Sequence, residues 1–108
     1  MRQAEVLYKK QVAGTLTQLD NGSFVFRYND AWMNDANKPA ISLTLPKQQQ
    51  EYTSTYLFPF FYNMLPEGSN KQVVCFEWRI DPKDYFGLLL AIAKYDTIGA
   101  IQIKKKEM

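Results

Sequence analysis

The segment "YLFPFFYNMLPEGSN", residues 56–70, most constrains the fold, because five aromatic side chains fall within its first seven residues. Aromatic groups bury large apolar areas, so they belong to a core, a ligand pocket or a partner surface. Pro59 suits the first turn of a helix, where its missing N–H would be unpaired in any case. Pro66 ends that helix at about Leu65, and Gly68 can adopt a left-handed conformation. The segment predicts a short aromatic helix followed by a Leu-Pro-Glu-Gly turn.

The stretch 5–29 has the pattern of a β-meander. Gly14 indicates a bulge or a close backbone approach within the second strand. Residues 20–23, Asp-Asn-Gly-Ser, predict a tight turn, because Asn and Gly tolerate positive φ. The chain then returns as a strand with one aromatic face: Phe24, Phe26 and Tyr28.

The next segment predicts an ordered loop and a fourth strand. Residues 29–39 are mostly polar, and Trp32 is expected to pin this loop to the core, with a contact role as the alternative. In "AISLTLP" the apolar residues alternate, which predicts a strand that ends at Pro46. Residues 47–54 are interpreted as a polar connector.

Residues 69–80 carry two conflicting signals. Ser69 and Gln72 have the spacing of a capping box, which predicts a second helix through about Trp78. Alternation of apolar residues from Val74 to Ile80 is typical of a strand instead. The cap and the Asp-Pro pair that follows favour the helix.

A third helix is expected after Asp81, which is interpreted as its N-cap with Pro82 at the first helical position. The residues from Tyr85 to Ala93 are almost all apolar, so this helix should be buried against more than one neighbour. Residues 96–99 predict a turn. A last strand then follows, with Ile101 and Ile103 on one face.

Length and composition favour one folded domain. A chain of 108 residues is near the commonest domain size, and 46% hydrophobic residues argue against disorder. We therefore expect residues 1–108 to form a single α+β domain, with an antiparallel sheet of about five strands and about three helices.

Catalytic signals are missing from the sequence. Histidine is absent and Cys75 is the single cysteine, which excludes histidine-based catalysis and a zinc cluster. The five glycines are isolated, so neither a phosphate-binding loop nor a dinucleotide fingerprint can form. Asp81 and Asp84 are interpreted as helix caps rather than a carboxylate pair. We expect no enzymatic activity, no cofactor and no metal.

The remaining features indicate a cytoplasmic protein. The first residues, "MRQAEVLYKK", lack the apolar core of a signal peptide, and no apolar run is long enough to cross a membrane. The net charge of +2 comes largely from Lys104, Lys105 and Lys106, and a mild excess at one end is weak evidence for nucleic-acid binding. No direct contact with nucleic acid is expected.

A phenylalanine-rich helix, a Leu-Pro-Glu-Gly turn, a Leu-rich helix and an Asp-x-x-Gly-Ala strand entry follow one another along the chain. Together these short motifs resemble the N-terminal subdomain of HipA-type serine/threonine kinase toxins. They are carried here by Phe60-Phe61, Leu65 to Gly68, Leu88 to Leu90, and Asp96 with Gly99-Ala100. Lys94 stands where the family commonly has glycine, and Ser69 replaces a residue that is often large and apolar.

The resemblance implies a regulatory role without catalysis. HipA-type kinases continue into a kinase core, which residues 1–108 do not contain. The expected function is a non-catalytic, antitoxin-like subunit that binds a HipA-like kinase core, in trans or in cis, and through that complex a DNA-binding antitoxin. The residues expected to contact the partner are Phe60, Phe61, Met64, Leu65, Pro66, Glu67 and Gly68.

Other readings of the sequence stay open. The chain can be a natural stand-alone protein, which the starting Met1 and the charged end favour, or a piece of a longer HipA-type kinase. It can also be a self-associating module that forms a homodimer, or a module that binds a small ligand.

Overall fold

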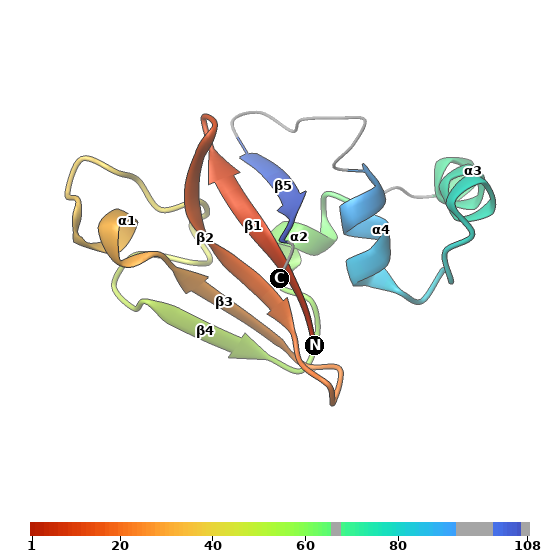
Figure 1. Cartoon of the computed structure of the whole chain (residues 1–108), viewed down its shortest axis with the longest axis horizontal. Helices are drawn as coiled ribbons and strands as arrows, with labels where there is room; N and C mark the ends of the chain where they lie inside the picture. Colours follow the sequence, from red (N-terminus) through yellow and green to blue (C-terminus); the bar gives the residue numbers. More distant parts are fainter. Residues whose placement is uncertain (66–67, 93–100, 107–108) are drawn as a thin grey trace.

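The computed structural model describes residues 1–65, 68–92 and 101–106, and within them it has five strands and four helices (Figure 1). The α+β prediction is confirmed, with α1 as one helix more than expected. The elements, in chain order, are β1 (Arg2–Tyr8), β2 (Gln11–Gln18), β3 (Phe24–Tyr28), α1 (Asp30–Asn34), β4 (Glu51–Ser54), α2 (Pro59–Tyr62), α3 (Gly68–Trp78), α4 (Tyr85–Ile92) and β5 (Ile101–Lys105).

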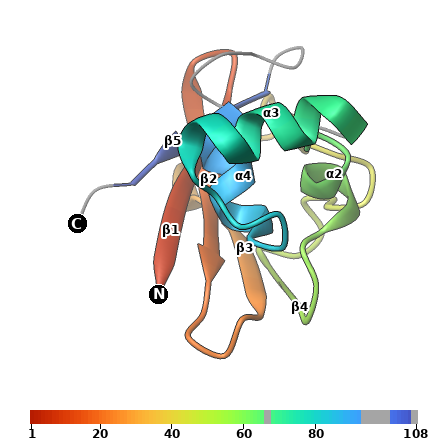
Figure 2. The same cartoon turned by 90° about the vertical axis from the view of Figure 1, so that its right-hand side faces the viewer.

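The sheet is antiparallel throughout, with the strand order β4-β3-β2-β1-β5. The strands β1 to β4 form a meander, and β5 returns to the opposite edge beside β1. The connection from β4 to β5 contains α2, α3 and α4; in Figure 2, α3 lies in front of α4, and α2 lies to their right. The expected last strand is confirmed, whereas the expected turn at 96–99 lies outside the described residues.

One face of the sheet forms the core. The register places Leu16 between Ala4 and Phe26, and Val6 beside Ile103, and all five side chains are buried. Because side chains alternate along a strand, the other face carries the residues in between. A row across that face is largely charged: Lys104, Glu5, Thr15, Arg27 and Glu51. The sheet thus has one apolar face and one polar face.

Gly14 lies at an irregularity in the β1–β2 pairing, as the sequence predicted. Val6 pairs with Gly14, whereas Leu7 pairs with Val12, so β2 contains one extra residue. A Cβ atom on Gly14 would lie 2.4 Å from the backbone oxygen of Arg27. Glycine is therefore required here by the close approach of the neighbouring strand.

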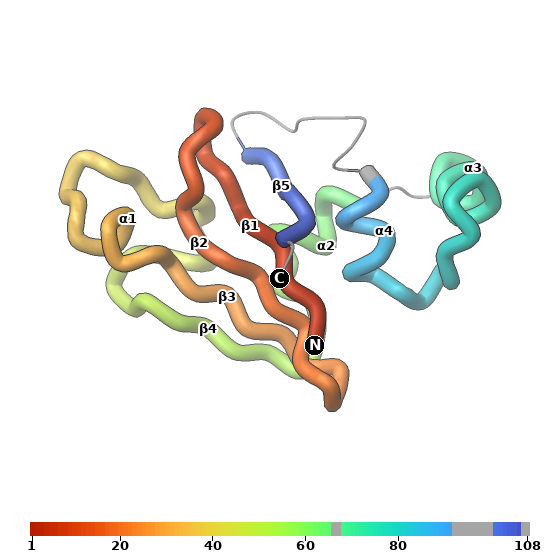
Figure 3. Tube along the Cα trace, in the orientation of Figure 1, coloured from red at the N-terminus to blue at the C-terminus, as the bar shows by residue number. Residues whose placement is uncertain are grey.

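The expected strand at 41–46 is wrong, and β4 lies instead in the supposed polar connector. The hydroxyl of Tyr28 accepts a hydrogen bond from the backbone N–H of Ile41 (3.0 Å) and donates one to the carbonyl of Leu45. These bonds hold the segment as a loop, traced in Figure 3 between α1 and β4. Ile41 and Leu45 are buried, while Leu43 is fully exposed.

Trp32 pins the preceding segment, as expected. The segment is not entirely a loop, because it contains α1. Trp32 lies on α1 and is buried, and its indole N–H donates to the carbonyl of Pro39 (2.8 Å). Its ring meets Tyr8 of β1 edge-on, with centroids 5.7 Å apart.

The helix preference for residues 69–80 is confirmed, because α3 covers Gly68–Trp78. Figures 1 and 2 show α3 on the outside of α4, which separates it from the sheet. No residue of α3 is buried, whereas Phe86, Leu88 and Leu89 of α4 are fully buried. The three helices between β4 and β5 thus form an inner layer, α2 and α4, and an outer helix, α3.

The start of α4 differs from the sequence prediction. Asp81 and Pro82 form a turn in which the carboxylate of Asp81 accepts from the N–H of Lys83 (2.8 Å). The helix begins at Tyr85, and Asp84 caps it by accepting from the N–H of Gly87 (3.1 Å). Asp84 is therefore the cap, as its interpretation as a capping group implied, and Asp81 is not.

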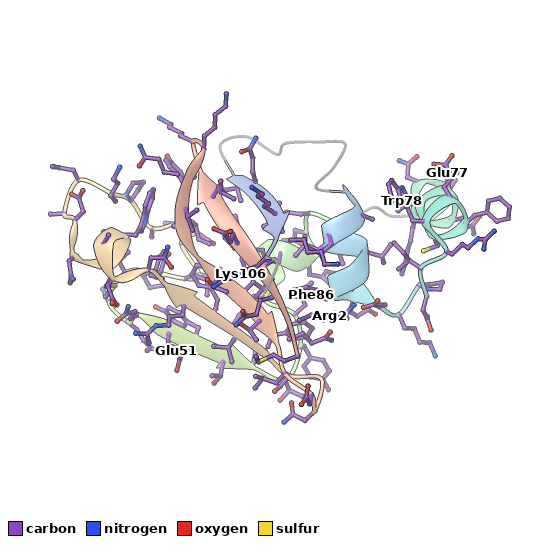
Figure 4. All side chains as sticks on the ribbon, viewed as in Figure 1. Arg2, Glu51, Glu77, Trp78, Phe86 and Lys106 are labelled. Carbon is purple, nitrogen blue, oxygen red and sulfur yellow. The ribbon has the colours of Figure 1, made fainter. Side chains whose placement is uncertain are left out.

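Arg2 explains why Asp84 holds this position. Its guanidinium donates to both carboxylate oxygens of Asp84, at 3.0 and 2.6 Å, and lies 5.0 Å from the centre of the Phe86 ring. Figure 4 shows Arg2 and Phe86 side by side, where β1 meets α4. The hydrogen bond from Arg2 is the main cause that lowers the pKa of Asp84 below its ordinary value.

Substitutions at Asp84 should distinguish the stability contributed by its charge from the stability contributed by its capping hydrogen bond. Asp84→Ala should lower the unfolding free energy by about 1–2 kcal/mol, because the cap and the ion pair are both lost. Asp84→Asn should cost less, since Asn also caps helices. Urea unfolding at about pH 7 measures both losses.

Stability measured at acidic pH distinguishes the contribution of the Asp84 charge from that of the cap. A lowered pKa contributes stability that is full above the ordinary value of 3.8 and is lost as the pH falls below it. The stability gap between wild type and Asp84→Asn should therefore shrink from about pH 7 to about pH 3. A gap of unchanged size at both pH values would show that the Arg2 ion pair contributes nothing.

Candidate partner-binding surface

The aromatic segment that dominates the sequence is mostly core. Phe61 is fully buried, and its ring lies 5.9 Å from Phe26 of the sheet and 6.3 Å from Phe58. Helix α2 starts at Pro59, as expected, but regular helix ends at Tyr62. Tighter turns continue the coil to residue 65. The aromatic segment therefore packs the helical layer against the sheet.

The residues predicted to contact a partner are divided by the structure. Phe61 belongs to the core in this conformation, while Phe60, Met64 and Leu65 are half-buried and pack against it. Gly68 is exposed and begins α3 with a φ of +57°. Pro66 and Glu67 lie outside the described residues. A partner contact through this segment stays a prediction, with its half-buried members at the edge of the core.

A more exposed apolar group lies on α3, and the sequence reading missed it. Val73 is 54% exposed and Phe76 is 86% exposed. They are three residues apart, so they lie on one side of the helix. Figure 4 shows Trp78 on the side of α3 that faces α4. The helix predicted for residues 69–78 already places Val73 and Phe76 on one side, so their three-residue spacing is the signal that could have found this group.

Contacts on the opposite side of α3 join the helix to α4 and α2. The rings of Tyr62 and Tyr85 meet edge-on at 5.5 Å, and the ammonium of Lys71 lies 5.7 Å from the Tyr85 ring centre. Tyr62 is itself 48% exposed. We call Val73 and Phe76 the helical surface. Exposed aromatic and aliphatic groups on a packed layer are typical of protein-binding sites.

The titratable groups show structural causes for their shifts. The pKa of Asp20 is lowered by the N-terminal ammonium of Met1, which lies 2.5 Å from its carboxylate. Burial raises the pKa of Tyr28, whose hydroxyl holds the loop described above. Within the described ranges no three metal-binding side chains come together, and none of the helices there could span a membrane.

Two neighbouring aromatics should separate core from surface. Phe61→Ala should reduce the unfolding free energy by about 3–5 kcal/mol, because it leaves a cavity between α2 and the sheet. Tyr62→Ala should cost about 1 kcal/mol, since it loses little more than the ring contact with Tyr85. Chemical denaturation measures both. Equal losses would mean that the aromatic segment is not divided in this way.

Known proteins match this chain over nearly its full length. Residues 4–104 match the family model described as the HipA N-terminal domain. A solved structure, the N-terminal domain of HipA toxin, matches with a TM-score of 0.71 and 29% identity, covering 99% of this chain and 94% of that one.

Relatives of two different sizes are similar to it. Putative kinase Y4mE of Sinorhizobium fredii is 31% identical over 95% of this chain, which spans only 24% of that protein. An uncharacterized protein of Haemophilus influenzae is 32% identical over 99% of this chain and 95% of its own length. Together with the family model, these matches show that the chain belongs to the HipA N-terminal domain family.

Proposed function

We propose that this chain is a non-catalytic regulatory, antitoxin-like subunit that binds the core of a HipA-like serine/threonine kinase. Family membership supports a relation to kinase toxins. The relative named as a kinase has about three quarters of its length outside the match. This supports a kinase core as the partner that we propose, in cis within one chain or in trans between two.

The helical surface is the observation that carries this proposal. An aromatic side chain that is 86% exposed, as Phe76 is, leaves most of its apolar area in water. Burying such a side chain in a partner contributes about 1.5–3 kcal/mol. Among the described elements, α3 packs mainly against α4, and Val73 and Phe76 on its other side are exposed. A partner that covers α3 would complete a layer that this domain leaves open.

The absence of catalysis is part of the proposal. The chain has no histidine and no glycine-rich phosphate loop, and the shifted carboxyl groups are explained by caps and ion pairs. Phosphoryl transfer by the purified chain would overturn it. We place the complex in the cytoplasm, where a DNA-binding antitoxin could join through the kinase.

The half-buried edge formed by Phe60, Met64 and Leu65 would extend the contact between this chain and the kinase core.

Removing the exposed ring should weaken the complex. Phe76→Ser should lower affinity for a HipA-like kinase core at least about tenfold, because central aromatic residues dominate binding energy. It should also relieve the effect of this chain on kinase autophosphorylation. Co-purification, titration calorimetry and a phosphorylation assay measure these changes.

Leu43 offers a matched control. It is another large apolar side chain in water, fully exposed in the loop between α1 and β4, and α1 lies at the end of the molecule opposite α3 (Figure 1). Leu43→Ser should leave binding unchanged. Equal effects of both variants would point to a general loss of hydrophobicity.

Light scattering tests the rival hypothesis that the chain forms a homodimer. If Phe76→Ser turns a dimer into a monomer, α3 joins two copies of this chain instead of binding a kinase.

A further inference from the structure

A pocket of about 400 Å³ lies between the β1–β2 turn and the loop that follows α1. Tyr8, Trp32 and Pro39 form its apolar wall, while Lys9 and Lys38 add positive charge. The volume is within the range of sites for small ligands, about 300–1,000 Å³. In Figure 1 the pocket's elements, α1 and the tip of β1, lie away from α3. It is therefore separate from the helical surface.

Lys38 is held in place rather than free in solvent. Its ammonium lies 5.2 Å from the centre of the Trp32 ring and donates a hydrogen bond to the side-chain oxygen of Gln11. Lys47 fixes the backbone beneath it by donating to the carbonyl of Lys38 at 2.7 Å. A cation that is already positioned loses little entropy when an anion binds to it.

The charge of the pocket is not balanced by the protein. None of the described residues that line it is acidic, and the ion pairs found in the described part of the chain do not involve Lys9 or Lys38. A concave site with one sign of charge concentrates ions of the opposite sign. The pocket therefore favours an anion.

The turn beside the pocket is strained. Lys9 and Lys10 form the two-residue loop between β1 and β2, and both have positive φ, 48° and 68°. Asn-Gly is the favoured pair at such a turn, because a larger L-residue with positive φ is disfavoured. Local strain that a simpler sequence would remove is common at functional sites. Here the residues that carry the strain also carry charge.

We propose that this pocket binds a small molecule in which a phosphate or carboxylate group is attached to a flat apolar ring. Lys9 and Lys38 would contact the oxyanion. The ring would lie against Tyr8 and Pro39, over the buried Trp32. The site goes beyond the proposed kinase contact, since it uses none of the residues of the helical surface.

Four probes separate the parts of such a ligand. Phenyl phosphate and benzoate carry a ring and an oxyanion, inorganic phosphate carries only the anion, and phenol carries only the ring. Titration of the full chain, followed by NMR shifts of Lys9, Lys10, Gln11 and the Trp32 indole, should show saturable binding of phenyl phosphate or benzoate. The tighter of these two identifies the oxyanion. Inorganic phosphate and phenol should each bind at least about tenfold more weakly.

Charge variants test the site directly. Lys38→Gln should weaken binding of the tighter probe at least about tenfold, because it removes the fixed cation. Lys83→Gln is the matched control: Lys83 is an exposed lysine in the turn before α4, so the net charge changes equally. It should change the affinity by less than about twofold, since charges beyond about 10 Å are screened by salt.

The turn provides a second test that loss of folding cannot imitate. Lys9→Asn combined with Lys10→Gly should raise the thermal midpoint while weakening the probe at least about tenfold. Kinase binding should be unchanged, so failure here and failure of the proposed function are distinguishable. The proposal is overturned if no probe saturates at millimolar concentration, if phenol binds as well as phenyl phosphate, or if Lys83→Gln weakens binding as much as Lys38→Gln.

Discussion

The packing of α4 on the apolar face of the sheet supports the rest of the helical layer. Phe86 and Leu89 are fully buried, and each contributes about 1.5–3 kcal/mol by leaving water. Arg2 fixes the start of α4 through Asp84, so β1 and the helix are also joined at their edge. The outer helix α3 has no buried residue of its own. Helix α3 keeps its position because α4 is packed on the sheet. The side of α3 that faces away from α4 therefore stays exposed.

Sequence reasoning succeeded where the signals are local. The alternation in β2 and β3, the turn at 20–23 and the helix at 68–78 depend on residues within a few positions of one another. It failed where distant residues decide. Tyr28 holds residues 41–45 as a loop through its hydroxyl. Arg2 contacts Asp84, the cap of α4, from 82 positions away in the sequence. A side chain that substitutes for a backbone partner leaves no periodic trace in the sequence.

The dense aromatic segment illustrates how far a candidate site can be predicted. Its composition indicated buried area but not whether that area faces the core or a partner. The structure divides the segment within five residues, because Phe58 and Phe61 point into the core whereas Tyr62 is half in water. The most exposed aromatic in the helical layer, Phe76, comes from the neighbouring α3. The predicted helix places Phe76 on the same side as Val73, and the structure adds that this side is exposed.

Strand β1 runs from the packed helix α4 to the charged pocket. Arg2 at its start contacts Phe86 of α4, and Tyr8 at its end lines the charged pocket, with a rise of about 20 Å between them. Both edges of β1 are paired, with β2 on one side and β5 on the other. A strand fixed in this way has no second arrangement that a ligand at one end could favour. Since a ligand shifts only states that it binds differently, occupancy of the pocket should leave the helical surface unchanged.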